Sequence, residues 1–295
     1  MLNLEYLAEL ARMNQDALDA RVQEFSIGGK AFAFNSRSHI MGVINLSSDS
    51  WYRESVCLST DAAVARAKVL NAQGADIVDI GAESTLAHAA EVSEWMQGSR
   101  LLPVIQQLRN LGILVSTETY HAKLARASLE AGANVINLTG TKGTDDIYRM
   151  AADHKAAVII CYVQGEHVRA VGDFDLKHDP VGLMYEYFAR EIERANKCGM
   201  QRVLIDPGLG FYYRNLQDSA TRVAHQMSVF VNTFRLRKLG YPVCHALPHA
   251  FEYFREEVRS AEGFFAVLAA LGKTDLFRTH EVARVKAVLD TLNVL

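Results

Sequence analysis

The feature that most constrains this chain is a repeated alternation of short β-type runs with stretches of helical periodicity. Most of the runs are rich in Val, Ile and Leu, as expected for strands buried on both faces of a parallel sheet. Strict alternation of such strands with helices predicts an α/β fold. The eight predicted strands are HIMGVIN (39–45), ADIVDIG (75–81), ILVSTE (113–118), NVINLT (134–139), AVIICYV (157–163), RVLIDPG (202–208), PVCHAL (242–247) and DLFRTH (275–280).

Eight strands with helices between them predict a single (β/α)8 TIM barrel. Amphipathic stretches such as 61–74, 122–132 and 183–199 separate the strands, and each ends on a Gly that suits a helix C-terminus. A doubly wound sheet shares the alternation but favours a glycine-rich phosphate turn after its first strand. The corresponding segment here, NLSSDSW (45–51), contains no glycine, which weakens that alternative.

Two segments precede the first predicted strand. Residues 1–24 have the pattern of an acidic, amphipathic helix and are predicted to form an N-terminal helical extension. The next segment, FSIGGKAFAF, indicates a β-hairpin that turns at Gly28 and Gly29 and covers the bottom of the barrel. No linker rich in Pro, Gly or Ser divides the rest, so residues 25–295 are predicted to form one domain.

Composition limits the classes of partner. Of the 295 residues, 49% are hydrophobic and 22% are charged, and the formal net charge is -3, so no basic excess attracts nucleic acid. No apolar run approaches the ~20 residues of a membrane span, and the N-terminus does not resemble a signal peptide. Four scattered cysteines without a CxxC pair argue against both disulfides and a zinc site. We therefore expect a cytoplasmic protein.

Polar side chains stand at or beside the C-terminal ends of the predicted strands. In a parallel barrel these ends share one rim, where catalytic groups are carried. We therefore expect the polar residues to converge on one site. The set comprises Asn45, Asp79, Glu83, Glu118, Asn137, Tyr162, Gln164, Asp206, His245, Arg278 and His280.

Five blocks of the sequence, in order, resemble the dihydropteroate synthase family, whose members are pterin-binding barrels of folate synthesis. The resemblance covers roughly residue 25 to the C-terminus, and five blocks in the right order make it specific. The blocks are IMGVINLSSDSW, GADIVDIGAESTLAHA, STETYHAKLARASLEAGANVIN, LIDPGLGF and FRTHEV.

The resemblance implies a pocket for a flat, polar pterin ring. Glu118, Asn137 and Asp206 match the family's pterin contacts, and Thr85 and Phe211 are further substrate-binding candidates. Carboxylates accept hydrogen bonds from ring N–H groups, and an amide both donates and accepts. The alternatives are strand-end polarity without a ligand for Glu118 and Asn137, and a capping role in a DPG turn for Asp206.

The resemblance also implies a transferase that joins an arylamine, p-aminobenzoate, to 6-hydroxymethyl-7,8-dihydropterin diphosphate with loss of diphosphate. Asn45, Arg278 and His280 match the diphosphate-side residues, and Asp49 is the candidate that approaches the developing cation. Arg suits this role because its planar fork binds phosphate oxygens bidentately. Mg²⁺ is the implied cofactor, with Asn45 as its ligand, and the implied oligomer is a homodimer.

Several positions depart from the family's pattern. Pro248, His249 and Ala250 stand where the family has Ser, Arg and Lys, and Leu86 and Ala87 replace an Arg and a Pro of the second loop. Glu118 replaces an Asp among the pterin contacts. The acceptor side and its covering loops are therefore largely changed, whereas the diphosphate-side residues and most pterin contacts remain. The alternative is a homologue without synthase activity that binds a pterin or a partner protein. A methyltransferase relative that uses a methyl-folate ranks last. Whether Lys142 or Arg214 replaces the missing Lys stays open.

Overall fold

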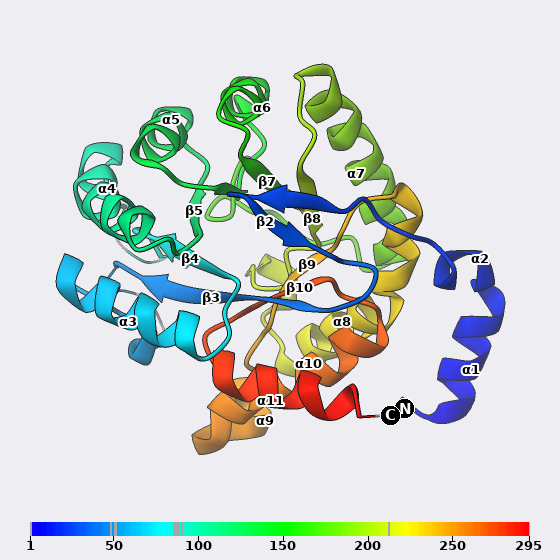
Figure 1. Ribbon diagram of the computed structural model, residues 1–295. Helices are drawn as coiled ribbons and strands as arrows, with labels where there is room; N and C mark the ends of the chain where they lie inside the picture. The colour runs from blue at the N-terminus through cyan, green and yellow to red at the C-terminus, as the bar shows by residue number, and fades with distance from the viewer. Residues whose placement is uncertain are drawn as a thin grey trace.

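The computed structural model describes residues 2–47, 49, 52–84, 89, 91–211 and 213–294. Eight parallel strands form a barrel in the order β8-β7-β6-β5-β4-β3-β10-β9. A parallel bridge between Ile205 and Val243 brings β8 beside β9 and nearly closes the cylinder (Figure 1). All eight predicted strands are confirmed, and their bounds are β3 His39–Asn45, β4 Ile77–Gly81, β5 Val115–Thr119, β6 Val135–Leu138, β7 Ala157–Cys161, β8 Val203–Asp206, β9 Cys244–Ala246 and β10 Leu276–Thr279.

Helices surround the barrel and follow the strands in turn (Figure 1). Gly132 and Gly199 end α5 and α7 with φ of 112° and 88°, a conformation that suits glycine because it has no Cβ. The α-helices after the first strand are α3 Thr60–Ala72, α4 Glu94–Asn110, α5 Ala122–Ala131, α6 Thr144–Asp153, α7 Pro180–Lys197, α8 Ser219–Asn232, α9 Phe251–Phe254, α10 Ala261–Leu271 and α11 Val282–Leu292. The 3-10 helices are η1 Arg53–Ser55, η2 Arg214–Leu216, η3 Thr233–Leu239 and η4 Arg255–Ser260.

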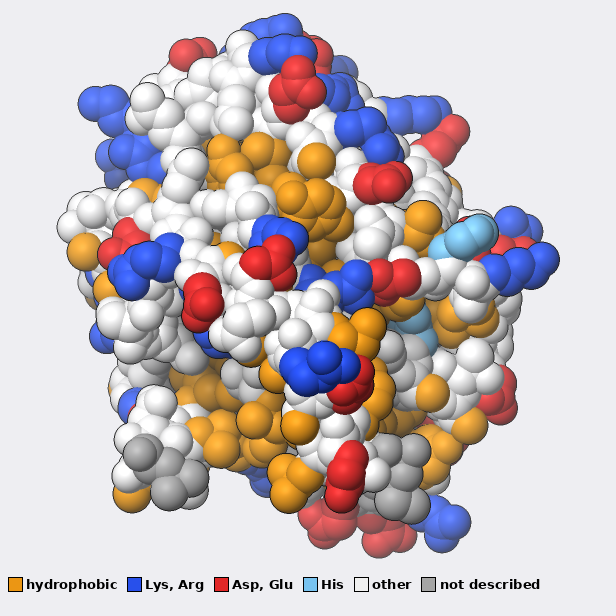
Figure 2. Space-filling model, turned by 90° about the vertical axis from the view of Figure 1, so that its right-hand side faces the viewer, with side chains coloured by type: hydrophobic (Ala, Val, Ile, Leu, Met, Phe, Trp, Pro, Cys, Tyr) orange, Lys and Arg blue, Asp and Glu red, His pale blue; other side chains and the backbone are white. Residues whose placement is uncertain are grey.

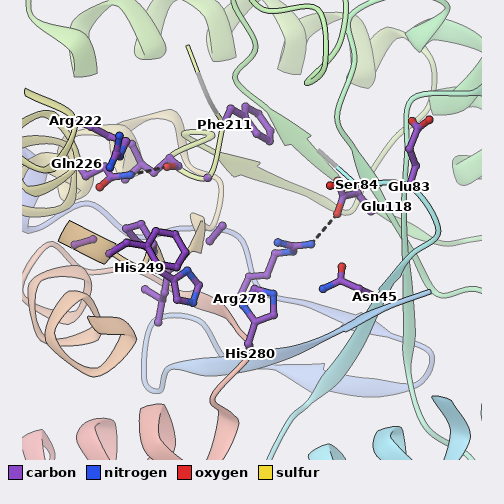
Figure 3. Close-up of a pocket in the computed structure, with 17 residues that line it drawn as sticks. Asn45, Glu83, Ser84, Glu118, Phe211, Arg222, Gln226, His249, Arg278 and His280 are labelled. Carbon is purple, nitrogen blue, oxygen red and sulfur yellow. Dashed lines mark hydrogen bonds and ion pairs between the residues drawn. The ribbon is translucent and has the colours of Figure 1, made fainter. Parts of the chain in front are cut away.

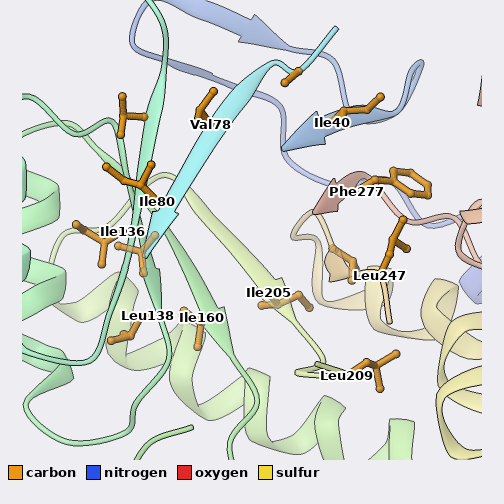
Figure 4. Close-up of a cluster of buried hydrophobic side chains, with 14 of the residues drawn as sticks. Ile40, Val78, Ile80, Ile136, Leu138, Ile160, Ile205, Leu209, Leu247 and Phe277 are labelled. Carbon is orange, nitrogen blue, oxygen red and sulfur yellow. The ribbon is translucent and has the colours of Figure 1, made fainter. Parts of the chain in front are cut away.

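The strands bury both of their faces, which explains their near-continuous apolar sequences. One set of side chains points toward the surrounding helices and forms the larger core, part of which is drawn in Figure 4. The alternate set fills the barrel interior. The interior layer includes Met41, Ile77, Val135, Ala157, Ile159, Leu204, Cys244 and Leu276. Because successive strand residues face opposite sides, every second residue is available to the interior.

The predicted hairpin is present as β1 Phe25–Ile27 and β2 Lys30–Phe32. Gly28 and Gly29 have φ of 55° and 86°, as a tight two-residue hairpin turn requires. Ile27 and Phe32 belong to the same buried cluster as the interior layer, so the hairpin covers the N-terminal end of the barrel as predicted. The opposite end is therefore the one that can admit a ligand.

The N-terminal segment lies against the outside of the barrel. It forms α1 Leu4–Met13 and the short α2 Gln15–Leu18, and Asp16 pairs with Lys238. Treating 1–24 as a separate unit stays a prediction. On the face shown in Figure 2, Lys and Arg side chains are interspersed with Asp and Glu. In the described part of the chain, no helix combines the length and apolar character needed to cross a membrane.

Candidate active site

The open end of the barrel gathers inward-facing residues from the C-terminal ends of seven strands. These residues line two adjoining cavities. They share a level in the barrel because the register pairs Glu118 with Asn137, Cys161 with Asp206, and Ala246 with Arg278. The seven are Asn45, Glu118, Asn137, Cys161, Asp206, Ala246 and Arg278.

Arg278 of β10 lies at the centre of this layer. Its Nε lies 2.7 Å from Oδ2 of Asp79 on β4. Its Nη2 lies 2.7 Å from Oε2 of Glu118 on β5, the contact drawn as a dashed line in Figure 3. The Asp79 side chain is fully buried and the Arg278 side chain is only 16% exposed. A buried charge without a partner is costly, so these two carboxylates hold the guanidinium in place.

Asn137 extends the polar network across the barrel. Its Nδ2 donates to Asp79 Oδ2 at 3.2 Å, and its Oδ1 accepts from the Cys161 thiol at 3.4 Å. Both ends of the amide are therefore oriented before any ligand binds. Hydrogen bonds that link buried side chains in this way restrict their orientations.

Asp206 ends β8 and is nearly inaccessible to solvent. Its Oδ1 accepts from the backbone N–H of Gly208 at 2.7 Å, so the capping role considered from the DPG sequence is present. Burial raises the pKa of Asp206 to about 6, although the Gly208 N–H and Arg278 act in the opposite direction. The same carboxylate lines the inner cavity, so capping does not exclude contact with a ligand.

Glu118 is the second carboxyl group of this cavity with a strongly shifted pKa. Burial raises its pKa to about 7, Arg278 opposes this change, and the carboxylates of Asp79 and Asp206 add to it. Like charges confined in one site disfavour simultaneous ionisation. The cavity therefore holds groups that take up or release protons near neutral pH.

The two cavities share Glu118, Phe211 and Arg278. The inner cavity is also lined by Asn137 and Asp206, which are the other two predicted pterin contacts. The outer cavity also contains the predicted diphosphate-side pair of Asn45 and His280. Figure 3 shows Arg278 between these regions, with its guanidinium directed toward Glu118. Seven predicted site residues therefore come together, although their individual roles stay predictions.

The two remaining predicted site residues are not placed in the cavities. Asp49 is exposed in the loop after β3, where its backbone N–H donates to Ser47 Oγ at 3.3 Å. It is not among the described residues lining either cavity. Thr85 lies outside the described residues, as do Leu86 and Ala87 of the second loop.

Three members of the predicted rim set lie outside both the two cavities and the buried polar network. One is Gln164, whose Nε2 donates to the Tyr162 hydroxyl at 2.6 Å. His245 of β9 faces the helix layer, where its Nε2 lies 2.7 Å from Thr233 Oγ1 and its ring packs against Phe230. Tyr162 directly follows β7, and its ring contacts Tyr187 of α7. The expectation that these three side chains join the site is wrong. His245 and Tyr162 are each one residue out of register with the inward positions.

The segment after β9, in which three residues differ from the family's pattern, forms one wall of the outer cavity. Pro248, His249 and Ala250 all line it. Neither Lys142 nor Arg214 is among the described residues that line this cavity, since the first pairs with Glu166 and the second lies 3.8 Å from Asp173. Besides Arg278, the described Lys and Arg residues that line it include Arg222 of α8, whose Nη2 lies 3.1 Å from Glu252.

Sequence reasoning assigned no role to three residues that the structure places at or beside the site. Asp79 was expected at the rim but was not assigned a role, and it proves to be the carboxylate that joins Arg278 to Asn137. His249 and Glu262 form a buried pair beside the outer cavity. Alternation along β4 places the Asp79 side chain inside the barrel, so this role could have been predicted from the sequence. Glu262 lies on α10, and no pattern in the neighbouring sequence indicates its position near the site.

Comparison with known proteins supports the same assignment. Residues 41–248 match the family described as "Pterin binding enzyme". The dihydropteroate synthase of Clostridium beijerinckii is 33% identical over 225 residues, which cover 74% of this chain and 76% of that protein. The dihydropteroate synthase of Bacillus subtilis is 28% identical, with 95% of this chain and 97% of that protein covered.

A solved structure agrees with these sequence matches. The dihydropteroate synthase of Xanthomonas albilineans in complex with 7,8-dihydropteroate superposes with a TM-score of 0.75 at 26% identity. The superposition covers 92% of this chain and 98% of that chain. The barrel, the order of the sequence blocks and these matches agree, and this chain belongs to the dihydropteroate synthase family of pterin-binding enzymes.

Proposed function

We propose that this protein is a dihydropteroate synthase-type transferase of folate biosynthesis. It joins p-aminobenzoate, or a related arylamine, to the methylene carbon of 6-hydroxymethyl-7,8-dihydropterin diphosphate. The amine nitrogen forms the new C–N bond, the C–O bond to diphosphate breaks, and the amine releases a proton. The observation that supports this reaction best is the convergence of Glu118, Asn137, Asp206 and Arg278 on one cavity in a member of this family.

The inner cavity is suited to the polar edge of a pterin. Asp206 and Glu118 supply carboxyl oxygens for ring N–H groups, and Asn137 offers an amide beside them. Phe211 adds an aromatic surface at the mouth of the same cavity. A ligand that leaves such buried groups unpaired loses ~1–3 kcal/mol for each, which is the basis for selecting a pterin.

The outer cavity is suited to the diphosphate. Arg278 and His280 can donate hydrogen bonds to its oxygens, and Arg278 also lines the inner cavity, so it lies beside both halves of the substrate. Asp49 is proposed to approach the cation that develops as diphosphate departs, which requires the loop after β3 to bring this exposed carboxylate inward. Bond breaking is helped by charge neutralisation at the leaving group.

Mg²⁺ is the proposed cofactor, and Asn45 is its proposed protein ligand. The amide nitrogen of Asn45 donates to Ser55 Oγ at 2.5 Å, so its carbonyl oxygen is the atom that can ligate. An amide oxygen is the type of ligand that Mg²⁺ accepts, together with water and substrate phosphate oxygens. When bound, the ion supplies neutralising charge to the diphosphate.

The proposed oligomer is a homodimer formed through the late helices. Its support is a set of large exposed apolar side chains on α9 and α10, where Tyr253 is 59% exposed and Phe264 is 41% exposed. Light scattering coupled to size-exclusion chromatography measures the mass directly. The proposed location is the cytoplasm, which agrees with the four cysteines being free.

Calorimetric titration with the pterin diphosphate and Mg²⁺ tests substrate binding. We expect one pterin site per chain. In Asp206→Asn the affinity should fall roughly 10-fold or more, because the substitution replaces a buried carboxylate oxygen, which accepts from ring N–H groups, by an amide NH2 group, which cannot accept. Asp175→Asn, an exposed carboxylate paired with His178, is the control and should leave the affinity unchanged. Absence of heat at high micromolar ligand would argue against the assignment.

A further inference from the structure

We propose that His249, Glu262 and His280 form a binding site for a divalent transition-metal ion of the zinc class. The three side chains come from the loop after β9, the first turn of α10 and the residue after β10. Their potential ligand atoms all lie within 4.8 Å of one another. This site is distinct from the Mg²⁺ proposed at Asn45, and it does not depend on the proposed reaction.

The geometry of the three side chains is close to that of a metal centre. Nε2 of His249 lies 2.8 Å from Glu262 Oε1, and Nδ1 of His280 lies 2.9 Å from the same oxygen. Zinc bonds to nitrogen and oxygen are ~2.0–2.2 Å, which in a tetrahedral site separates neighbouring ligand atoms by about 3.3–3.6 Å. A bound ion would therefore require the carboxylate oxygen and each imidazole to separate by roughly half an ångström.

The donor set indicates which ion would bind. Two imidazoles and one carboxylate are a ligand set that zinc uses in catalytic sites, with the remaining position open to water or substrate. Mg²⁺ prefers oxygen ligands alone, so these histidines would select against it. The scattered cysteines argue against a zinc site, but that reasoning does not cover a site built from His and Glu.

The surrounding residues orient these ligands. The backbone N–H groups of His280 and Glu281 each donate to Glu262 Oε2 at 3.1 Å, and the Thr279 hydroxyl donates to the same oxygen. The Tyr52 ring stacks on His280 with a centroid separation of 4.4 Å. Outer contacts of this kind fix ligand orientation in metal sites, and here they hold Glu262 Oε1 toward the two histidines.

Burial and electrostatics favour a cation at this position. The side chains of His249, Glu262 and His280 are 4%, 0% and 12% exposed, so the carboxylate is removed from solvent. Because a buried carboxylate is costly without a partner charge, a cation bound against Glu262 would be favoured.

The open side of the site would face the outer cavity. His249 and His280 both line that cavity, together with Asn45 and Arg278 (Figure 3), whereas Glu262 is fully buried and is not among the described lining residues. A bound ion would therefore present its remaining coordination position to the cavity, where water or an anionic oxygen could occupy it. His249 stands where the family has an Arg, so the ion would place positive charge on a wall that has lost a cation.

Zinc titration of the full-length protein tests this site. Protein without a histidine tag is stripped with EDTA, dialysed and titrated with Zn²⁺ in competition with a chromogenic chelator. We expect one ion per chain and at least a 10-fold weaker affinity in His249→Gln and in Glu262→Gln.

His178→Gln is the matched control, because His178 and Asp175 form an exposed pair with the same 2.8 Å separation. This variant should bind zinc as the wild type does. Circular dichroism verifies that each variant is folded, and His249→Gln carries the test if Glu262→Gln unfolds. No zinc binding by the wild type at micromolar concentration would overturn the proposal, and so would binding that persists unchanged in His249→Gln. The titration uses no pterin, so a failure of the proposed transferase reaction would leave its result interpretable.

Discussion

At the scale of single residues, Arg278 connects most of the polar groups in the barrel mouth. Its guanidinium contacts carboxylates from two other strands, and one of these carboxylates contacts Asn137 in turn. Removing the charge would leave Asp79 and Glu118 as buried carboxylates without their cation, which is strongly destabilising. A substitution that keeps the charge therefore separates the function of this side chain from its structural role.

Arg278→Lys keeps a positive charge but cannot present a planar fork to phosphate oxygens and to two carboxylates together. We expect a fall in kcat of roughly 100-fold with the fold retained, since losing one donor at a developing negative charge has effects of that size. Steady-state kinetics with a parallel thermal melt measures both. Arg149→Lys, an exposed residue paired with Asp146 on α6, should be silent, and comparable losses in both variants would contradict the role of Arg278.

The raised pKa of Glu118 predicts a pH dependence of stability. A carboxyl group with a pKa of about 7 in the folded state and 4.5 as its ordinary value binds more protons when folded. Stability linked to this group is therefore complete below pH 4.5 and is lost as pH rises through 7. The wild-type free energy of unfolding should fall by about 2 kcal/mol more than that of Glu118→Gln between pH 5 and pH 8.

Denaturant unfolding of the two proteins at both pH values checks this expectation. The difference between the proteins isolates Glu118 together with the neighbours that titrate with it, because most other groups are common to both. Equal pH dependence in the two proteins would show that Glu118 ionises normally inside the barrel.

At the scale of the elements, the sequence predicted the strands well because their residues have a simple period. Each strand alternates between the interior and the helix layer, so Glu118, Asn137, Asp206 and Arg278 reach the cavity as inward residues at strand ends. His245 illustrates the limit of this reasoning. It is polar and near a strand end, but the neighbouring Ala246 occupies the inward position.

Other parts of the site depend on contacts that no local pattern encodes. Glu262 comes from α10 and meets His280 across 18 positions of sequence. The pairing of Arg169 with Glu83, at 2.9 Å, likewise joins the loop after β7 to the loop after β4. Such contacts follow from how helices and loops pack on the finished barrel, so neither helical nor strand periodicity could predict them.

Because the end of α10 packs closely against α8, adding one methyl group at Gly272 is expected to lower the stability of the protein. A Cβ at Gly272 would lie 1.8 Å from the backbone oxygen of Phe230 on α8, so Gly272→Ala must displace backbone. We expect a loss of about 1–3 kcal/mol in the free energy of unfolding, as for other overpacked positions. Chemical denaturation measures this change.

Gly263→Ala on the same helix is the matched control. A Cβ there would meet its nearest neighbour, Val288, at 3.7 Å, which is ordinary contact. Replacing a helical Gly by Ala should stabilise the protein by about 0.5–1 kcal/mol. If both variants have the same stability, the close approach of α10 to α8 is not as the structure describes it.

At the scale of the whole molecule, the two ends of the barrel have different roles. The hairpin covers the N-terminal end, and the C-terminal end holds the inner cavity with its polar groups and the outer cavity with Asn45 and His280. The residues matching the pterin and diphosphate contacts meet there, whereas Pro248, His249 and Ala250 alter the wall on which the family has Ser, Arg and Lys. The pterin and diphosphate contacts are retained while the acceptor side has changed. Two functions fit this pattern: a transferase with a modified acceptor side, and a protein that binds a pterin without catalysing a reaction.

A turnover assay with the pterin diphosphate, Mg²⁺ and p-aminobenzoate decides between these possibilities. Diphosphate release and dihydropteroate formation are followed in the same reaction, because transfer to the amine requires equal amounts of both products. A transferase gives the two products in a 1:1 ratio, at a rate that falls sharply in Arg278→Lys. Pterin binding by calorimetry without release of diphosphate would contradict the proposed reaction.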